Sequence, residues 1–290
     1  MTKYKSYVIG FSTQEISTLT TDEIEAFFVE GQKWDLTSTL KQGGVIIFPH
    51  TLIRTSGAYI ASVVLACLRS GARRVIGIGV LHSLDKANLI EARAKARRGE
   101  DVSKDACRGI FGTNFPGDQT WRTEYSLESF SFLWDYAIKK LQIENPPELI
   151  LAYPSIANKE PETLPGVDQL KSYLPDSVVV ATADFCHHGV AYPLTMKPII
   201  PISEAARTFA IDIIEQGFKI IEKPDFSALI DYCFKTVCDG TDVFQVLAYL
   251  LGPLKSRIVD IKLVDVSHLY ENDPSPSWVA ATLISMLPLS

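Results

Sequence analysis

Three short apolar runs of this sequence each end beside side chains that can bind a metal ion or move a proton. Such runs, bounded by polar residues, are typical of buried strands. The runs and the residues that follow them are Gly43–Pro49 with His50, Arg74–Val80 with His82, and Ser177–Ala183 with Asp184, Cys186, His187 and His188. Two imidazoles and one anionic side chain make a ligand set for a redox-active or Lewis-acid metal ion. The pattern therefore indicates a metal site.

The spacing alone leaves the third ligand of this site open. A thiolate in that position would favour a softer ion such as iron(II), copper or zinc over magnesium. A carboxylate or a further imidazole is compatible with the same spacing. The candidates for the third ligand are Cys186, Cys238, Asp184 and His187.

The elements that must position these residues alternate between strand-like and helix-like segments. This alternation predicts an α/β fold with a mixed, largely parallel sheet flanked by helices, in one domain over residues 1–290. The apolar runs are continuous, as expected for parallel strands buried on both faces. Val259–Val266 and Trp278–Met286 are predicted to be closing strands. In such sheets ligands bind beyond the carboxyl ends of the strands, where the histidines lie.

Composition narrows the class of protein. The formal net charge of −6 speaks against an electrostatic nucleic-acid binder. The sequence has no apolar stretch of membrane-spanning length, and its N-terminus lacks the apolar core of a signal peptide. Its five cysteines are odd in number and form no C-x-x-C pair, which favours a reducing compartment. We therefore expect a cytoplasmic protein with no nucleic-acid partner and no membrane partner.

Four motifs, spread over nearly the whole chain, carry a resemblance to a known family. They are Pro49-His50 with Gly57, Gly79-Val80-Leu81-His82, Asp184-Phe185-Cys186-His187-His188-Gly189, and Thr236-Val237-Cys238-Asp239-Gly240. In this order they resemble the Memo family, the B component of the AmmeMemoRadiSam group. That family shares its fold with the class III extradiol ring-cleaving dioxygenases, so the resemblance implies the same fold here.

The resemblance also implies roles for individual residues. Carried over by position, it implies a metal site made of His50, His82 and Cys238. Asp184 and His187 would line the same cleft, either behind the ligands or as an acid/base pair. In the dioxygenases the third ligand is a glutamate, so a cysteine there would set this branch apart. A thiolate donates more electron density to the metal than a carboxylate does, and it is itself open to oxidation.

These observations lead to one main functional hypothesis and two alternatives. The main hypothesis is a Memo-like protein with a mononuclear iron or copper site that supports redox or oxygen-dependent chemistry. Tyr125 replaces a family histidine, which weakens the ring-cleaving version of this hypothesis. One alternative is a non-catalytic module that binds a small molecule or a peptide in the metal cleft. The other is a zinc hydrolase in which Asp184 acts as base on a metal-activated water.

Overall fold

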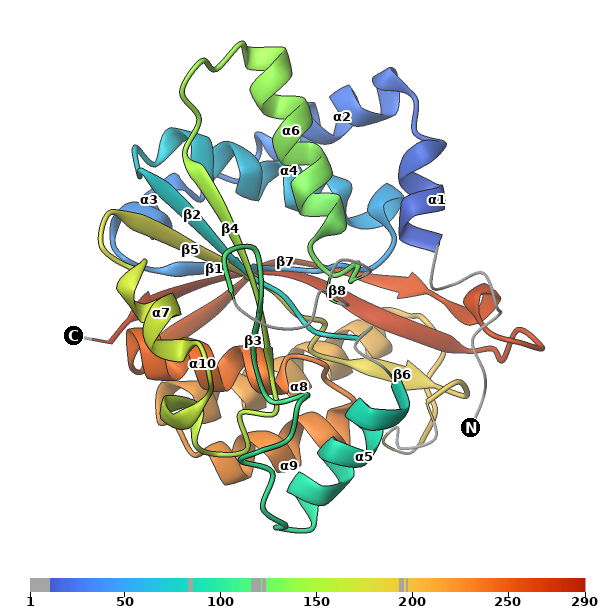
Figure 1. The fold of residues 1–290 in the computed structure, drawn as a ribbon. Helices are drawn as coiled ribbons and strands as arrows, with labels where there is room; N and C mark the ends of the chain where they lie inside the picture. The colour runs from blue at the N-terminus through green and yellow to red at the C-terminus, as the bar shows by residue number, and fades with distance from the viewer. Residues whose placement is uncertain are drawn as a thin grey trace.

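One eight-stranded sheet crosses the middle of the molecule, and helices pack on both of its faces (Figure 1). The computed structural model describes residues 11–82, 86–115, 121, 124–192, 196 and 198–289. The arrangement confirms the predicted α/β class with a mixed sheet flanked by helices.

The sheet is parallel in its centre and antiparallel at its sides. The strands are β1 (Val45–Phe48), β2 (Arg74–Ile78), β3 (Gly109–Gly112), β4 (Glu148–Ser155), β5 (Ser177–Thr182), β6 (His187–Gly189), β7 (Leu254–Asp265) and β8 (Ser277–Pro288). Their order is β3-β4-β2-β5-β1-β8-β6, with β7 paired to β8. The strands β4, β2, β5 and β1 run parallel to one another, and the remaining strands pair antiparallel. The parallel part is thus half of the sheet.

The parallel centre brings three chain segments to one edge. Phe48 at the end of β1 is in register with Thr182 at the end of β5, and Ile78 of β2 is in register with Ala181. The carboxyl ends of β1, β5 and β2 therefore lie side by side. The segments that leave these three ends carry His50, His82 and Asp184.

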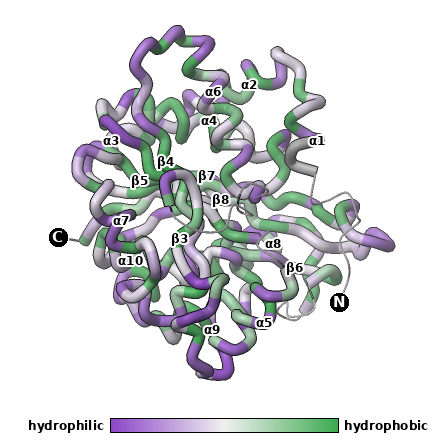
Figure 2. The backbone as a smooth tube through the Cα atoms, in the orientation of Figure 1, coloured by the Kyte–Doolittle hydropathy of each residue, from purple (hydrophilic) through white to green (hydrophobic). Residues whose placement is uncertain are grey.

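Two layers of helices cover the sheet. The helices are α1 (Phe11–Ser17), α2 (Thr21–Gly31), α3 (Thr37–Lys41), α4 (Ile53–Arg69), α5 (Lys86–Arg97), α6 (Glu128–Leu141), α7 (Val167–Ser172), α8 (Glu204–Glu222), α9 (Phe226–Thr236) and α10 (Thr241–Leu251), with short 3-10 turns at Pro161–Thr163 and Ser267–Leu269. Buried side chains of α2, α4 and α6 form one core, and those of α8, α9 and α10 form the other. Hydrophobic residues, coloured green in Figure 2, are frequent along the strands between the two helix layers. Burial of apolar side chains on the two faces of the sheet supplies the main stabilisation of the fold.

The two closing strands are confirmed, and both are longer than the sequence indicated. They form β7 and β8, which pair antiparallel from Leu254 opposite Pro288 to Asp265 opposite Trp278. A short connection with only one 3-10 turn joins them. A parallel pairing needs a longer crossover, so this connection makes the pair antiparallel.

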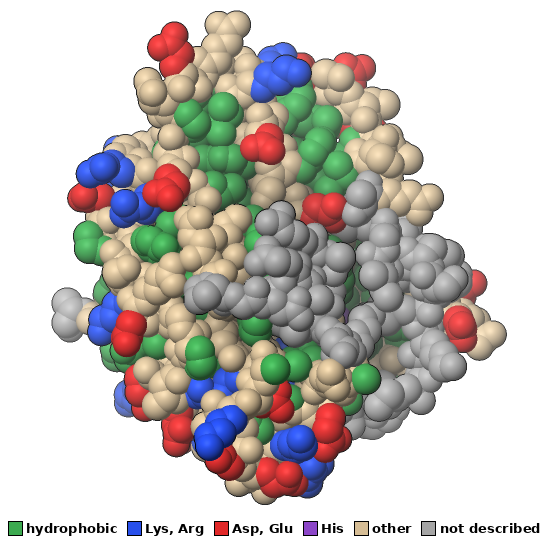
Figure 3. Space-filling model, viewed as in Figure 1, with side chains coloured by type: hydrophobic (Ala, Val, Ile, Leu, Met, Phe, Trp, Pro, Cys, Tyr) green, Lys and Arg blue, Asp and Glu red, His purple; other side chains and the backbone are tan. Residues whose placement is uncertain are grey.

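Charged side chains of both signs are interspersed over the coloured surface in Figure 3, most densely around the lower helices. That face therefore presents no broad field of a single sign among the residues drawn in colour. Within the described ranges, no helix combines the length and the apolar character needed to cross a lipid bilayer.

Candidate metal centre

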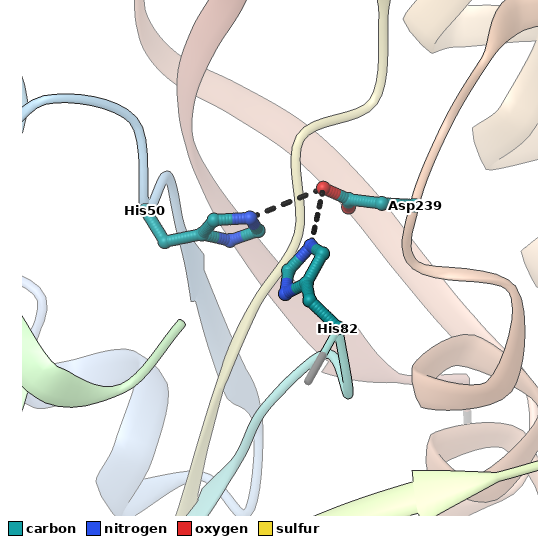
Figure 4. Close-up of side chains that lie close together, drawn as sticks. All are labelled: His50, His82 and Asp239. Carbon is teal, nitrogen blue, oxygen red and sulfur yellow. Dashed lines mark ion pairs between the residues drawn. The ribbon is translucent and has the colours of Figure 1, made fainter. Parts of the chain in front are cut away.

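Two imidazoles and one carboxylate converge at the carboxyl edge of the parallel strands (Figure 4). His50 follows β1, His82 follows β2, and Asp239 lies in the loop between α9 and α10. One potential ligand atom from each of the three lies within 4.8 Å of the others. Nε2 of His50 is 3.1 Å from Oδ2 of Asp239, and Nε2 of His82 is 3.9 Å from the same oxygen.

Hydrogen bonding fixes the tautomer of His50. Its Nδ1 lies 2.9 Å from Oγ1 of Thr182. The Thr182 hydroxyl donates its only proton to the carbonyl oxygen of Phe48 at 2.8 Å, so it accepts from Nδ1–H of His50. In neutral His50 the free lone pair is then on Nε2, the nitrogen that faces Asp239. Such support of the far nitrogen is typical of histidines that bind metals.

His82 is oriented in the same way by a buried carboxylate. Its Nδ1 lies 2.8 Å from Oε1 of Glu124, and because an ionised carboxylate only accepts, Nδ1–H is the donor. The backbone N–H of His82 donates to the other oxygen of Glu124. The ring of Tyr125 stacks on the imidazole with centroids 4.6 Å apart. The side chain of Glu124 is fully buried, so this orientation is held by the protein interior.

The loop that carries Asp239 is held against the end of β5. Oδ1 of Asp239 accepts the backbone N–H of Asp184 at 2.9 Å, which leaves Oδ2 toward the histidines. The loop approaches closely at Gly240, where a Cβ atom would lie 2.7 Å from Cβ of Ala183. Val237, which follows α9 and caps its C-terminal end, has a left-handed backbone with φ 55°. This conformation is uncommon for a β-branched residue, and it aims the following residues at the site.

The electrostatics of the cluster favour a positive charge among the carboxylates. Burial would lower the pKa of His50, but Asp184 and Asp239 outweigh it and raise this pKa to about 9. Burial alone would raise the pKa of Asp239, but His50 holds it down at about 2. The pKa of Glu124 is about 2 for the same reason, because the charge and hydrogen bonds of His82 outweigh its burial. A metal ion would supply positive charge at Nε2 of His50 in exchange for its proton.

The residues present fit a first-row transition-metal ion. Two histidines whose Nε2 atoms face one carboxylate match the ligand set that binds non-haem iron(II), and sets of two histidines and a carboxylate also hold catalytic zinc. Asp184 adds a further sign of a cation site, because its buried Oδ1 has no hydrogen-bond partner among the described residues. A buried carboxylate oxygen is costly to leave unpaired.

The structure brings together four of the five site residues predicted from sequence. His50 and His82 lie in one donor group, and Asp184 and His187 lie in a second, adjacent group. Cys238 is in neither group among the described residues. Its thiol is buried, and burial, reinforced by Cys233, raises its pKa well above the ordinary value. Asp239, the next residue, lies beside the two histidines, where the resemblance had implied Cys238.

Sequence reasoning missed two residues of the centre. Asp239 stood beside the favoured Cys238, and Glu124 stood beside the altered Tyr125. Both are carboxylates next to residues that the motifs singled out, and that adjacency was the available signal. Which of two neighbouring side chains faces a site depends on local backbone angles, which spacing does not specify.

A cleft of about 380 Å³ adjoins the cluster. His82 and Asp239 line it on the side of the centre, and Arg97 and Phe234 line it from α5 and α9. The cleft gives an organic ligand access to the same edge of the sheet. Neither the protein-family models nor the curated proteins include a match to this chain.

Proposed function

We propose that this chain is a Memo-like metal-binding protein that holds one iron or copper ion and supports redox or oxygen-dependent chemistry. The ligands are His50, His82 and Asp239. The observation that carries the proposal is the state of the two imidazoles. Each donates Nδ1–H to an acceptor in the protein, so both Nε2 atoms face one carboxylate oxygen, and Nε2 of His50 becomes a metal ligand when the ion replaces its proton.

The carboxylate ligand favours iron(II) over copper. Two histidines and one carboxylate are the set used by non-haem iron oxygenases, whereas a thiolate favours copper(I). When bound, such an ion supplies Lewis acidity and an electron-transfer partner for dioxygen. The chain itself fixes the ligand rings through Thr182 and Glu124, and it covers one face of His82 with Tyr125.

The adjoining cleft supports binding of a small molecule or a peptide beside the ion. Its lining combines apolar side chains such as Ile230 and Phe234 with charged ones such as Arg97 and Lys159. His82 and Asp239 belong to both the cleft and the donor group, so a ligand in the cleft would lie next to the ion.

A zinc hydrolase is the second candidate because the same two histidines and carboxylate form a zinc-binding set. Oδ2 of Asp184 lies 3.8 Å from Nε2 of His50 and is within reach of a water near the ligands. The metal identity separates the two candidates. Zinc favours hydrolysis, and iron or copper favours redox chemistry.

The decisive experiment measures the metal content of anaerobically purified protein by plasma mass spectrometry. Three variants accompany the parent protein: His50→Ala, Asp239→Asn and the matched neighbour Cys238→Ser. We expect near-stoichiometric iron or copper that is lost in His50→Ala and Asp239→Asn and kept in Cys238→Ser. Loss in Cys238→Ser with retention in Asp239→Asn would return the third ligand to the thiol. If the folded parent takes up no metal even on reconstitution, the metal-centre proposal fails and the non-catalytic module remains.

A further inference from the structure

A second donor group lies beside the first and shares one residue with it. Ligand atoms of Asp184, His187 and Asp239 lie within 4.8 Å of one another. Asp184 leaves the end of β5, and His187 begins β6. Asp184 and His187 are not among the ligands proposed for the first ion, which are His50, His82 and Asp239.

The imidazole of His187 is oriented like those of the first group. Its Nδ1 lies 2.7 Å from the carbonyl oxygen of Val237, and because a carbonyl only accepts, Nδ1–H is the donor. The lone pair of neutral His187 is therefore on Nε2. The neighbouring His188 is arranged differently, because its Nε2 accepts the backbone N–H of Ile200 at 3.0 Å. Only the first of these two adjacent histidines offers Nε2 to a ligand.

Asp184 supplies an oxygen that the described protein leaves unpaired. Its Oδ2 accepts from the hydroxyl of Thr51 at 2.8 Å, but its buried Oδ1 has no hydrogen-bond partner among the described residues. Only about 3 % of the residue is exposed. Buried carboxylates are normally paired or bound to a cation, so an unpaired oxygen in this position points to a cation.

Asp239 can serve both groups at once. Its Oδ2 faces His50 and His82, and its Oδ1 is on the side of Asp184, whose N–H it accepts. A carboxylate has two oxygens with about four lone-pair directions, which is enough for two cations and a hydrogen bond. Pairs of metal ions in enzymes lie roughly 3.5–4 Å apart.

We propose that Asp184 and His187 hold a second divalent transition-metal ion, linked to the first through the carboxylate of Asp239. This inference rests on the proposed function for the first ion. It replaces the two roles that the family resemblance left open for Asp184 and His187, which were groups behind the ligands or an acid/base pair. The centre is then dinuclear, with one ion anchored by β1 and β2 and the other by β5 and β6.

The test counts ions in the full chain. The protein is stripped with a chelator, reloaded with excess Zn²⁺, desalted and measured by plasma mass spectrometry. We expect two ions per chain in the parent protein and one each in Asp184→Asn and His187→Gln. His188→Gln is the matched control and should keep two. Circular dichroism checks that each variant is folded.

A second measurement requires no variant. Parent protein loaded with Mn²⁺ should give the electron paramagnetic resonance spectrum of a spin-coupled pair. The spectrum of an isolated Mn²⁺ ion would overturn the inference. One Zn²⁺ in the parent, unchanged in Asp184→Asn and His187→Gln, would overturn the second site and leave the first intact. No Zn²⁺ in the parent would overturn both proposals. Loss of all zinc in a folded Asp184→Asn variant would assign Asp184 to the first ion and also refute a separate second site.

Discussion

Glu124 orients His82 without touching the proposed ion, so replacing it by glutamine tests how the protein prepares a metal ligand. Its Oε1 accepts Nδ1–H of His82 at 2.8 Å and the backbone N–H groups of Tyr125 and Ser126 at 3.0 Å each. Its Oε2 accepts the backbone N–H of His82. Glutamine has the same shape but only one acceptor oxygen. If that oxygen takes the place of Oε1, the side-chain amide nitrogen takes the place of Oε2 and faces the backbone N–H of His82, which then has no acceptor there.

The magnitude follows from these contacts. Removing a carboxylate that supports a metal-binding histidine typically costs 10- to 100-fold in metal affinity, or about 1.4–2.7 kcal/mol. One buried backbone N–H without an acceptor costs about 1–3 kcal/mol of unfolding free energy. We therefore expect Glu124→Gln to bind Zn²⁺ or Fe²⁺ about 10- to 100-fold more weakly. The metal-free variant should also unfold at lower urea concentration than the parent.

Competition titration against a chelator at fixed pH measures the affinity, and urea denaturation measures the stability. Glu148→Gln is the control, because Glu148 is surface-exposed and pairs with Arg74 away from the site. The double variant Glu124→Gln/His82→Ala isolates the mechanism. If Glu124 acts through His82, its replacement should change metal affinity little once His82 is absent. An equal loss of affinity in both backgrounds would refute this reasoning.

The glycine beside Asp239, the cap of α4 and the bound ion can each be perturbed separately. Gly240→Ala should weaken metal binding in the chelator titration and lower the unfolding free energy in urea denaturation by about 1–3 kcal/mol. The reason is that the new Cβ would lie 2.6 Å from Cε2 of Phe244 and displace the loop of Asp239. Gly77→Ala is the control for both measurements, because the nearest atom to its new Cβ outside its chain neighbours is 3.4 Å away. Glu15→Ala should lower the unfolding free energy by about 1–2 kcal/mol in urea denaturation and leave metal affinity nearly unchanged. The buried carboxylate of Glu15 caps α4, because it accepts the backbone N–H groups of Ile53 and Arg54 at 2.9 and 3.2 Å. Unchanged stability of the variant would contradict that role. Free metal at about 100 times the dissociation constant of the first ion should stabilise the parent by about 2.7 kcal/mol through that ion in thermal unfolding. A chelator should reverse this stabilisation, and His50→Ala should lack this contribution. A shift in His50→Ala equal to that of the parent would place the first ion elsewhere.

The sequence predicted the parts of the site that depend on strands. His50, His82 and Asp184 follow continuous apolar runs, and such runs form parallel strands whose carboxyl ends meet at one edge. The alternation of strands and helices was enough to predict the α/β class. The antiparallel side of the sheet was harder to predict, since the pairing of β7 with β8 depends on the short connection between them.

The parts that depend on loop geometry were not predictable in the same way. Asp239 reaches the histidines because Val237 adopts a left-handed backbone and the loop packs tightly at Gly240. A β-branched residue gives no sequence signal for a left-handed conformation, which usually favours glycine or asparagine. Glu124 lies in a loop before α6, and only the fold brings it to His82.

The choice between Cys238 and Asp239 as third ligand depends on the cost of ionising each side chain. Asp239 is already held ionised by His50, with a pKa of about 2. Burial, together with the neighbouring Cys233, raises the pKa of Cys238 well above the ordinary value of a thiol. An ion must therefore displace a tightly held proton to bind the thiolate. A soft ion such as copper(I) gains most from a thiolate, whereas iron(II) and zinc are well served by the carboxylate that already faces both histidines.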